Sequence, residues 1–232
     1  MYIISMDRHI GLDPSLSSTA VCDMTSGQPD EFHVFTTVDL KNKWMKHAEL
    51  FASLYPVQYN SKGSYSDTEV NKLNDFRKNA YEIIDTINCG PGDHVYMEGY
   101  ASRAKGNIID LVVFGTFVRE RIVDSGAELH IITPMALKKN WAEAIYPKDK
   151  KGVARNNELK ANSKGEMIGI AGGSFKKHQM MLGLYEMEED SVFKKEMEMH
   201  RAEIMPLKGI PKPFDDCVDA FALSFLGITG KI

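Results

Sequence analysis

The sequence is poor in the residues and runs that define several protein classes. It has three cysteines among 232 residues, widely separated and without a Cys-x-x-Cys pair. This pattern argues against a disulfide framework and a zinc knuckle, so we expect Cys22, Cys89 and Cys217 in the core or on helices. No apolar run approaches a membrane span, and "MYIISMDRHIG" carries its charges after the apolar patch, the reverse of a secretory signal. We expect a soluble, intracellular protein with no membrane partner.

Positive charge is also scarce over the chain as a whole. The net charge is −4, whereas a general polyanion binder is usually basic. The distribution is uneven, because the segment from Lys138 to Lys177 has ten Lys or Arg residues against four acidic ones. Such a run is most often a solvated face, and it is also a candidate phosphate-contacting surface. Its candidate contacts are Lys148, Lys150, Lys151, Arg155, Lys176 and Lys177.

The chain does have enough apolar sequence, with 43 % hydrophobic residues, for one domain with a large core. Short apolar runs between turn residues predict strands, and longer periodic runs predict helices. The predicted strands are "YIISMD" or "HIGLD", then "TAVCDM", "EFHVFTTV", "HVYMEGY" and "AELHIITP". The predicted helices are 66–87, 107–126 and the segment "FDDCVDAFALSFL" between prolines and a glycine.

The order of these elements predicts an α/β fold. Three strands with short links favour an antiparallel arrangement, and the later alternation of strands and helices favours parallel pairing, so we expect a mixed central sheet flanked by helices. In the helix 66–87, Ser66 and Glu69 are placed as a capping box. Its apolar stripe is Val70, Leu73, Ala80, Ile84 and Ile87. Residues 41–65 and 142–175 are harder to assign, and we treat both as insertions or mobile arms.

Two acidic residues occupy unusual places on predicted strands. Asp13 ends an apolar run in "IGLDPSLSSTAV", where it is either an ordinary turn residue or a metal or phosphate site. Glu98 lies among apolar residues in "VYMEGY", where it either faces water on an edge strand or is paired or metal-bound. Neither residue decides between these interpretations alone.

The last predicted helix adds two more carboxylates. Asp216 and Asp219 are three residues apart, so they share a helical face and can converge on one ligand. Alternatively, acidic residues in a first turn simply favour the helix dipole. Together with Asp13 and Glu98 they form a set of hard oxygen ligands that suits magnesium or manganese. The absence of a Cys or His cluster in the sequence argues against structural zinc.

The order of the acidic motifs "GLDPS", "MEG" and "DDCVDAFALS", with "GGSFKKHQMM" before the last, resembles the RuvC-type Holliday junction resolvases. The resemblance implies a single RNase H-like nuclease domain over 1–232, with insertions near 41–65 and 142–175, in a phage or viral member of the family. Lys177 and Gln179 take positions of the family's Lys-x-Gln signature. Ser15 stands where a glycine is usual. Asp215 is adjacent to Asp216, so the family's last acidic pair could be aligned in either of two registers. The small and apolar residues after Asp219 favour the register that uses Asp216 and Asp219.

This resemblance implies an endonuclease that resolves four-way DNA junctions with two Mg²⁺ ions, for which Mn²⁺ substitutes. Asp13 is expected to bridge the metals, Glu98, Asp216 and Asp219 to complete their coordination, and Lys177 to neutralise a phosphate. The expected partner is branched DNA, in the cytoplasm of a bacterium or an infected host cell. Symmetric cutting implies a homodimer. The apolar helix 107–125 is either its interface or part of the chain's own core.

Three alternatives stay open or are less favoured. Another RNase H-like nuclease, acting on flaps, on RNA–DNA hybrids or in packaging, would use the same carboxylates. A branched-DNA binding module would carry them without catalysis. An actin-like or sugar-kinase-like ATPase also has an Asp followed by small hydroxyl residues, but the chain has no second such loop for the second lobe.

Overall fold

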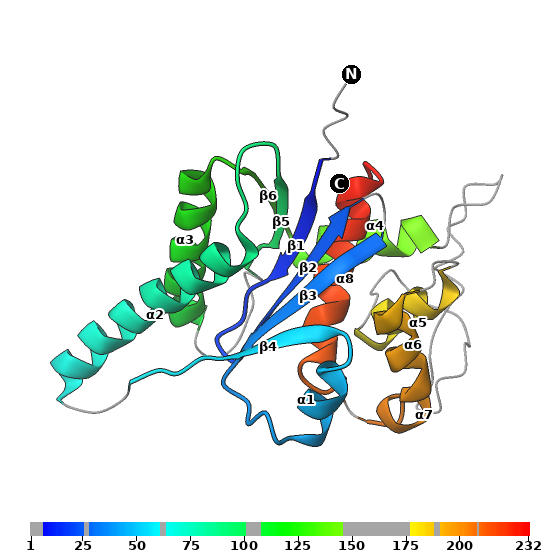
Figure 1. The fold of residues 1–232 in the computed structure, drawn as a ribbon, viewed down its shortest axis with the longest axis horizontal. Helices are drawn as coiled ribbons and strands as arrows, with labels where there is room; N and C mark the ends of the chain where they lie inside the picture. Colours follow the sequence, from blue (N-terminus) through cyan, green and yellow to red (C-terminus); the bar gives the residue numbers. More distant parts are fainter. Residues whose placement is uncertain are drawn as a thin grey trace.

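The structure is a computed structural model that describes residues 7–25, 28–60, 64–100, 108–145, 177–187, 191–207 and 209–232. A six-stranded sheet lies between two groups of helices (Figure 1). The strands are β1 (His9–Asp13), β2 (Ser18–Thr25), β3 (Gln28–Thr36), β4 (Ala52–Pro56), β5 (His94–Glu98) and β6 (Glu128–Ile132). Their order across the sheet is β4-β3-β2-β1-β5-β6.

The strand directions confirm the predicted fold class. The pairs β1–β2 and β2–β3 are antiparallel, as the short links between them require. The pairs β1–β5 and β5–β6 are parallel, because a helix or a long connection returns the chain between them. The result is the mixed α/β sheet, antiparallel first and parallel afterwards, that is expected of an RNase H-like fold.

The helices are α1 (Lys43–Ala48), α2 (Tyr65–Ile87), α3 (Ile108–Ser125), α4 (Pro134–Ile145), α5 (Lys177–Glu186), α6 (Val192–Met199), α7 (Arg201–Ile204) and α8 (Phe214–Ile228). The pair α2 and α3 covers one face of the sheet, and α8 with the remaining helices covers the other (Figure 1). None of the helices in the described ranges is long and apolar enough to cross a membrane.

Residues along β1 alternate between the core on the α2 and α3 side of the sheet and the core on the α8 side. Ile10 and Leu12 are buried against α2 and α3. Gly11 faces α8 so closely that a β-carbon there would lie 1.9 Å from the Ala220 carbonyl oxygen. The backbone of α8 therefore rests directly on β1, a close approach that only glycine permits.

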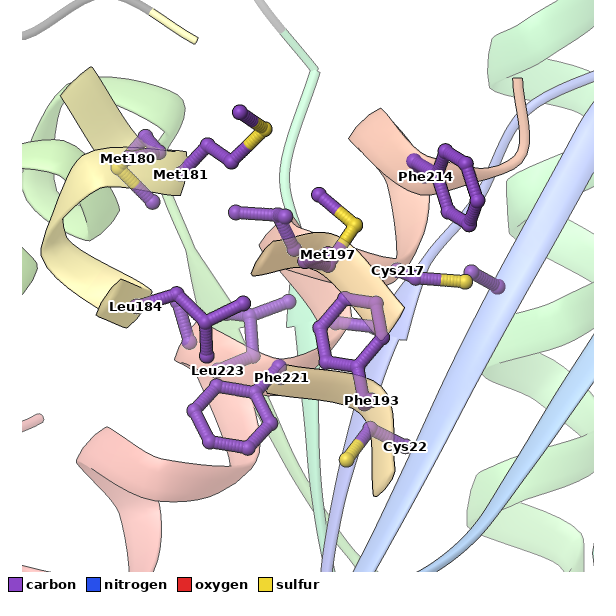
Figure 2. Close-up of a cluster of buried hydrophobic side chains, with 14 of the residues drawn as sticks. Cys22, Met180, Met181, Leu184, Phe193, Met197, Phe214, Cys217, Phe221 and Leu223 are labelled. Atoms are coloured by element: carbon purple, nitrogen blue, oxygen red, sulfur yellow. The ribbon is translucent and has the colours of Figure 1, made fainter. Parts of the chain in front are cut away.

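The core on the α8 side is rich in methionine and phenylalanine. Figure 2 shows Phe193 of α6 and Phe221 of α8 beside Cys22 of β2, with Met197 above them. The hydroxyl of Ser224 donates a 2.6 Å hydrogen bond to the Cys22 carbonyl oxygen and so fixes α8 to β2. All three cysteines are buried and none forms a disulfide, which confirms their predicted place in the core.

The first turn of α2 differs from the prediction. The helix is capped by Ser64, which forms a capping box with Asp67, so the predicted box of Ser66 and Glu69 is wrong. Two overlapping Ser-x-x-acid patterns occur here, and the earlier one is used. The predicted apolar stripe holds only in the C-terminal half, because the N-terminal half extends beyond the sheet (Figure 1). There Val70 and Leu73 are 55 % and 47 % exposed.

Much of the region 41–65 is part of the body of the fold. It contains α1 and β4, and β4 pairs in parallel with β3 as the edge strand of the sheet. Describing residues 43–56 as a mobile arm is therefore wrong, because their backbone is hydrogen-bonded into regular elements. In the other unassigned region, residues 142–145 end α4. Residues 146–175 lie outside the described part of the chain.

Candidate active site

Two neighbouring parallel strands carry the first two carboxylates to one edge of the sheet. Leu12 of β1 pairs with Met97 of β5, so Asp13 and Glu98 follow at the same level. Side chains alternate along a strand. Asp13 stands two residues after Gly11 and therefore points toward α8. It is 6 % exposed, so it is a buried acid and not a solvated turn residue.

Helix α8 supplies the other two carboxylates from above this edge. Asp216 and Asp219 are 2 % and 0 % exposed. Asp13, Glu98 and Asp219 each offer an oxygen, and these three atoms lie within 4.8 Å of one another. Asp216 lies close enough to Asp13 for the Asp13 charge to raise its pKa. The fold thus gathers the four predicted acids from the two strand ends and one helix.

Burial raises the pKa of every member of this set, and the charge of a neighbouring carboxylate adds to the effect. Burial is the largest cause for Asp13, followed by the charge of Glu98. Burial also raises the pKa of Glu98 most, and the charge of Asp219 adds to it. The pKa of Asp219 is raised by burial, against the opposing effect of Lys177. The fold therefore holds these carboxylates in surroundings that disfavour their charged form unless cations are present.

Two lysines stand against the acids. The Lys177 ammonium forms an ion pair with Asp219, and the Lys212 ammonium forms one with Asp216 and lies 3.5 Å from Asp215. For Lys177, burial lowers the pKa, but the charges of Asp219 and Asp13 outweigh burial and raise it. The pKa of Lys212 is raised in the same way by Asp216 and Asp215.

Two ammonium groups cannot balance four carboxylates. Consistent with this imbalance, the Asp216 Oδ2 and Asp219 Oδ1 atoms are buried without a hydrogen-bond partner in the described part of the chain. Buried oxygens of this kind require a cation or a proton. Because every donor here is a carboxylate oxygen, the set fits hard divalent cations such as Mg²⁺ or Mn²⁺.

A cavity of about 250 Å³ opens beside Glu98. Gly99, Tyr100, Lys138 and Lys177 are among its lining residues. Lys138 lies on α4, which follows β6, the parallel neighbour of β5. The cavity therefore places two ammonium groups beside the carboxylates, where an anionic group can be held by both.

The predicted site residues divide into two sets. Asp13, Glu98, Asp216, Asp219 and Lys177 come together as described above. The predicted DNA contacts Lys148, Lys150, Lys151, Arg155 and Lys176 lie outside the described residues.

Two lysines near the acids were not anticipated as site residues. Lys212 is four residues before Asp216 in "KPFDD", and this spacing was the available signal. Lys138 follows a strand parallel to β5 by a few residues, and such positions gather at the carboxyl edge of the sheet. On the question of register, Asp216 is buried beside Asp13 whereas the side chain of Asp215 keeps 18 % exposure, which favours the pairing of Asp216 with Asp219.

No family model and no curated protein matches this sequence. Among solved structures, the chain is similar to RuvC of Thermus thermophilus, with 12 % identity over 97 % of each chain and a TM-score of 0.44. It is similar to T. thermophilus RuvC in complex with Holliday junction substrate, with 11 % identity over 97 % of each chain and a TM-score of 0.44. It is also similar to the yeast mitochondrial Holliday junction resolvase Ydc2, with 10 % identity over 99 % of this chain and 83 % of that chain and a TM-score of 0.43.

Proposed function

We propose that this chain is a metal-dependent endonuclease that resolves four-way DNA junctions by hydrolysing phosphodiester bonds. The observation that supports this most is the meeting of Asp13, Glu98 and Asp219, whose oxygens lie within 4.8 Å of one another, with Asp216 beside Asp13. Such a buried set has no structural use that a salt bridge or an apolar residue would not serve better.

In this proposal, two cation positions lie around Asp13. Glu98 and Asp219 lie near one another and near Asp13. Asp216 also lies near Asp13, whose charge raises the pKa of Asp216, whereas the charge of Lys212 lowers it. We therefore infer that Asp13, Glu98, Asp216 and Asp219 would hold two Mg²⁺ ions, for which Mn²⁺ would substitute. When bound, such ions activate water as a nucleophile and stabilise charge on the phosphoryl and leaving oxygens.

The lysines have a separate part in the proposed reaction. Lys177 and Lys138 line the cavity beside Glu98, where they are positioned to hold a phosphate of the DNA backbone. Lys177 neutralises Asp219 while no cation is present, and a cation at that carboxylate would release its ammonium for the phosphate. Lys212 stands in the same relation to Asp216.

Branched DNA as the substrate rests on the sequence motifs that resemble the resolvases. Two symmetric cuts need two active sites, so we propose a homodimer acting in the cytoplasm of a bacterium or an infected host cell. On α3, Phe114, Val118 and Ile122 are buried in the chain's own core, whereas Ile109 and Val123 are 76 % and 61 % exposed. The outer side of α3 is the proposed dimer interface.

The test compares a labelled four-way junction, a flap and an RNA–DNA hybrid, each with Mg²⁺, with Mn²⁺ and with a chelator. We expect paired symmetric cuts in the junction that need the metal, and slower or no cutting of the other two. Faster cutting of the hybrid or flap would favour another RNase H-like nuclease. Tight junction binding without cutting under any metal would favour a non-catalytic binding module.

A further inference from the structure

A second group of potential metal ligands lies away from the carboxylate site. It consists of His47 on α1, Glu196 on α6, and His200, which ends α6 and precedes α7. His47 Nδ1 is 3.5 Å and His200 Nε2 is 2.9 Å from the same atom, Glu196 Oε1. The two imidazole centroids are 3.8 Å apart. One ligand atom from each residue lies within 4.8 Å of the others.

Glu196 is the reason to look for a cation here. Its side chain is only 3 % exposed. Among the described residues, its ion-pair partners are His47 and His200, with no lysine or arginine. A buried carboxylate is unfavourable unless it is paired with a cation or coordinates a metal. Two imidazoles provide that cation only by taking up a proton, whereas a metal ion would satisfy all three side chains at once.

The arrangement fits a small tetrahedral ion. At zinc–nitrogen and zinc–oxygen bond lengths near 2 Å, the ligand atoms of a tetrahedral site lie about 3.3 Å apart. The distances of 3.5 and 2.9 Å to Glu196 Oε1 bracket this value. Two imidazoles and one carboxylate are a common donor set for Zn²⁺, whereas Mg²⁺ prefers oxygen donors alone. A water would complete the fourth position.

The surroundings also match what a metal-bound imidazole needs. A metal on His200 Nε2 leaves the ring proton on Nδ1, and this atom is buried without a hydrogen-bond partner in the described residues. Glu203 Oε1 lies 3.9 Å away from it, and Lys43 of α1 holds Glu203 through an ion pair. A carboxylate at this position typically orients a metal-bound histidine. Trp44 packs edge-on against His200 and shields the group.

We propose that His47, Glu196 and His200 bind a Zn²⁺ ion that fastens α1 to α6. The ion would anchor the segment that leads into the edge strand β4 to the helices on the α8 side of the sheet. The sequence gives no sign of this site, because His47 is far from Glu196 and His200 along the chain and only the fold brings them together. The absence of a His cluster in the sequence is therefore no argument against zinc here.

A second trio of this type provides a control. His94, Glu128 and His130 lie at one end of β5 and β6, with ligand-atom separations of 3.3, 3.3 and 3.5 Å. Glu128, however, is 64 % exposed. Water solvates its charge, so this trio has no need of a cation. We therefore assign the zinc to the buried trio and use the exposed one for comparison.

The experiment measures zinc affinity by competition with a chromophoric chelator, and melting temperature with zinc or with EDTA, at saturating Mg²⁺ to occupy the carboxylate site. Glu196→Gln keeps the size of the side chain and removes the buried charge, so the zinc-free protein should stay folded. We expect wild type to bind one Zn²⁺ and to melt higher with it. Glu196→Gln should lose more than about tenfold in zinc affinity together with the melting shift.

His47→Asn is the second variant, because the side chain of His47 is 28 % exposed and its loss leaves the core intact. It should lose the same zinc affinity, whereas the double variant His94→Asn with His130→Asn should keep it. Co²⁺ in wild type should give the visible absorption of a four-coordinate site, and this absorption should be absent from His47→Asn. Any one of three results would overturn the proposal. These are the absence of a zinc-dependent shift in the melting temperature of wild type, zinc binding by Glu196→Gln as tight as that of wild type, and loss of zinc affinity in the His94/His130 variant alone. None of these measurements uses DNA cleavage.

Discussion

Asp13 is the residue around which the carboxylate site is organised. It offers an oxygen within 4.8 Å of oxygens of Glu98 and Asp219, and its charge also acts on Asp216. Burial and the Glu98 charge raise its pKa, and Lys177 acts in the opposite direction. An ordinary turn aspartate, the other interpretation of the motif "LDPS", would be solvated and free of such neighbours.

Asp13→Asn tests this role, since the amide keeps the size of the side chain and removes its charge. The variant should bind a four-way junction with unchanged affinity and lose metal-dependent cleavage. In EDTA its melting temperature should equal or exceed that of wild type, because the repulsion of Asp13 by Glu98 and Asp219 is gone. Cleavage assays and thermal melts check both statements. Normal cutting by the variant would remove Asp13 from the active site.

Individual residues also mark what a sequence can and cannot predict about the site. Asp13, Glu98 and the Asp216–Asp219 pair were identified because acids at strand ends and on an apolar helix are costly without a partner. Lys212 was missed although it lies only four residues before Asp216, because a lysine and an acid at this spacing commonly pair at a helix surface and do not by themselves mark a site. The trio of His47, Glu196 and His200 has no local pattern that would join α1 to α6.

At the scale of elements, α8 is both core and site. Its apolar side chains fill the core in Figure 2, and its first turns hold Asp216 and Asp219 over the ends of β1 and β5. If Asp216 and Asp219 only favoured the helix dipole, they would lie in solvent. Instead they are buried among like charges, which is the arrangement that cation binding relieves.

Asp219→Asn and the matched control Asp215→Asn separate the two interpretations of this helix. Wild type should melt at a higher temperature with Mn²⁺ than with EDTA, because the ion binds the folded state. Asp219→Asn should largely lose this rise and lose cleavage. Asp215→Asn, whose carboxylate lies beside Lys212 outside the trio, should keep the rise. Equal metal stabilisation of wild type and Asp219→Asn would show that α8 is not part of a metal site.

The pH dependence of stability follows from the same contact between α8 and the sheet. The pKa values of Asp13, Glu98, Asp216 and Asp219 are raised in the folded protein from ordinary values of 3.8 to 4.5. Above those ordinary values the folded state binds more protons than the unfolded state, so the metal-free protein loses stability as pH rises through the raised pKa values. Urea unfolding in EDTA from about pH 5 to about pH 8 should show wild type declining relative to Asp13→Asn.

Saturating Mn²⁺ supplies the counter-test of this pH dependence. A cation binds the deprotonated carboxylates, so the decline of wild type relative to Asp13→Asn should shrink or reverse when Mn²⁺ is present. A relative stability that is flat with pH in EDTA would contradict the repulsion inferred for the cluster.

Elements were predicted well where one periodicity dominated and poorly where local signals competed. The strands around Asp13 and Glu98 and the helix α8 follow from apolar runs bounded by turn residues. The start of α2 was misplaced because Ser64 and Ser66 each precede an acid by three residues. The strand β4 was missed because its pairing with β3 is a long-range contact, and nothing in "ASLYP" itself records that partner.

At the scale of the whole molecule, the basic segment of the sequence is joined to elements that carry residues of the carboxylate site. The carboxylates are buried at one edge of the sheet, and the lysine-rich segment lies between α4 and α5 in the sequence. The helices on either side of that segment, α4 and α5, carry Lys138 and Lys177 of the cavity beside Glu98. The two helices that flank the segment in the sequence therefore each place a lysine beside the proposed cleavage site.

Replacing Lys148, Lys150, Lys151 and Arg155 together by Ala tests whether this segment contacts DNA. Affinity for a four-way junction should fall, and the slope of log affinity against log salt should flatten by up to about four, since each lost phosphate contact releases one counterion fewer. Binding titrations at several salt concentrations measure both. An unchanged slope would assign the run to solvated surface charge.

The contact at Gly11 sets the distance between the two parts of the carboxylate site. Because this residue lacks a β-carbon, α8 sits on the bare backbone of β1, and the height of the helix above the strand sets how far Asp216 and Asp219 stand from Asp13 and Glu98. Gly11 thus allows the closest possible approach between the two carboxylates on the strands and the two on α8. Even Ala at this position would tilt or lift α8, and would so lower the affinity of the carboxylates for cations without replacing any of them.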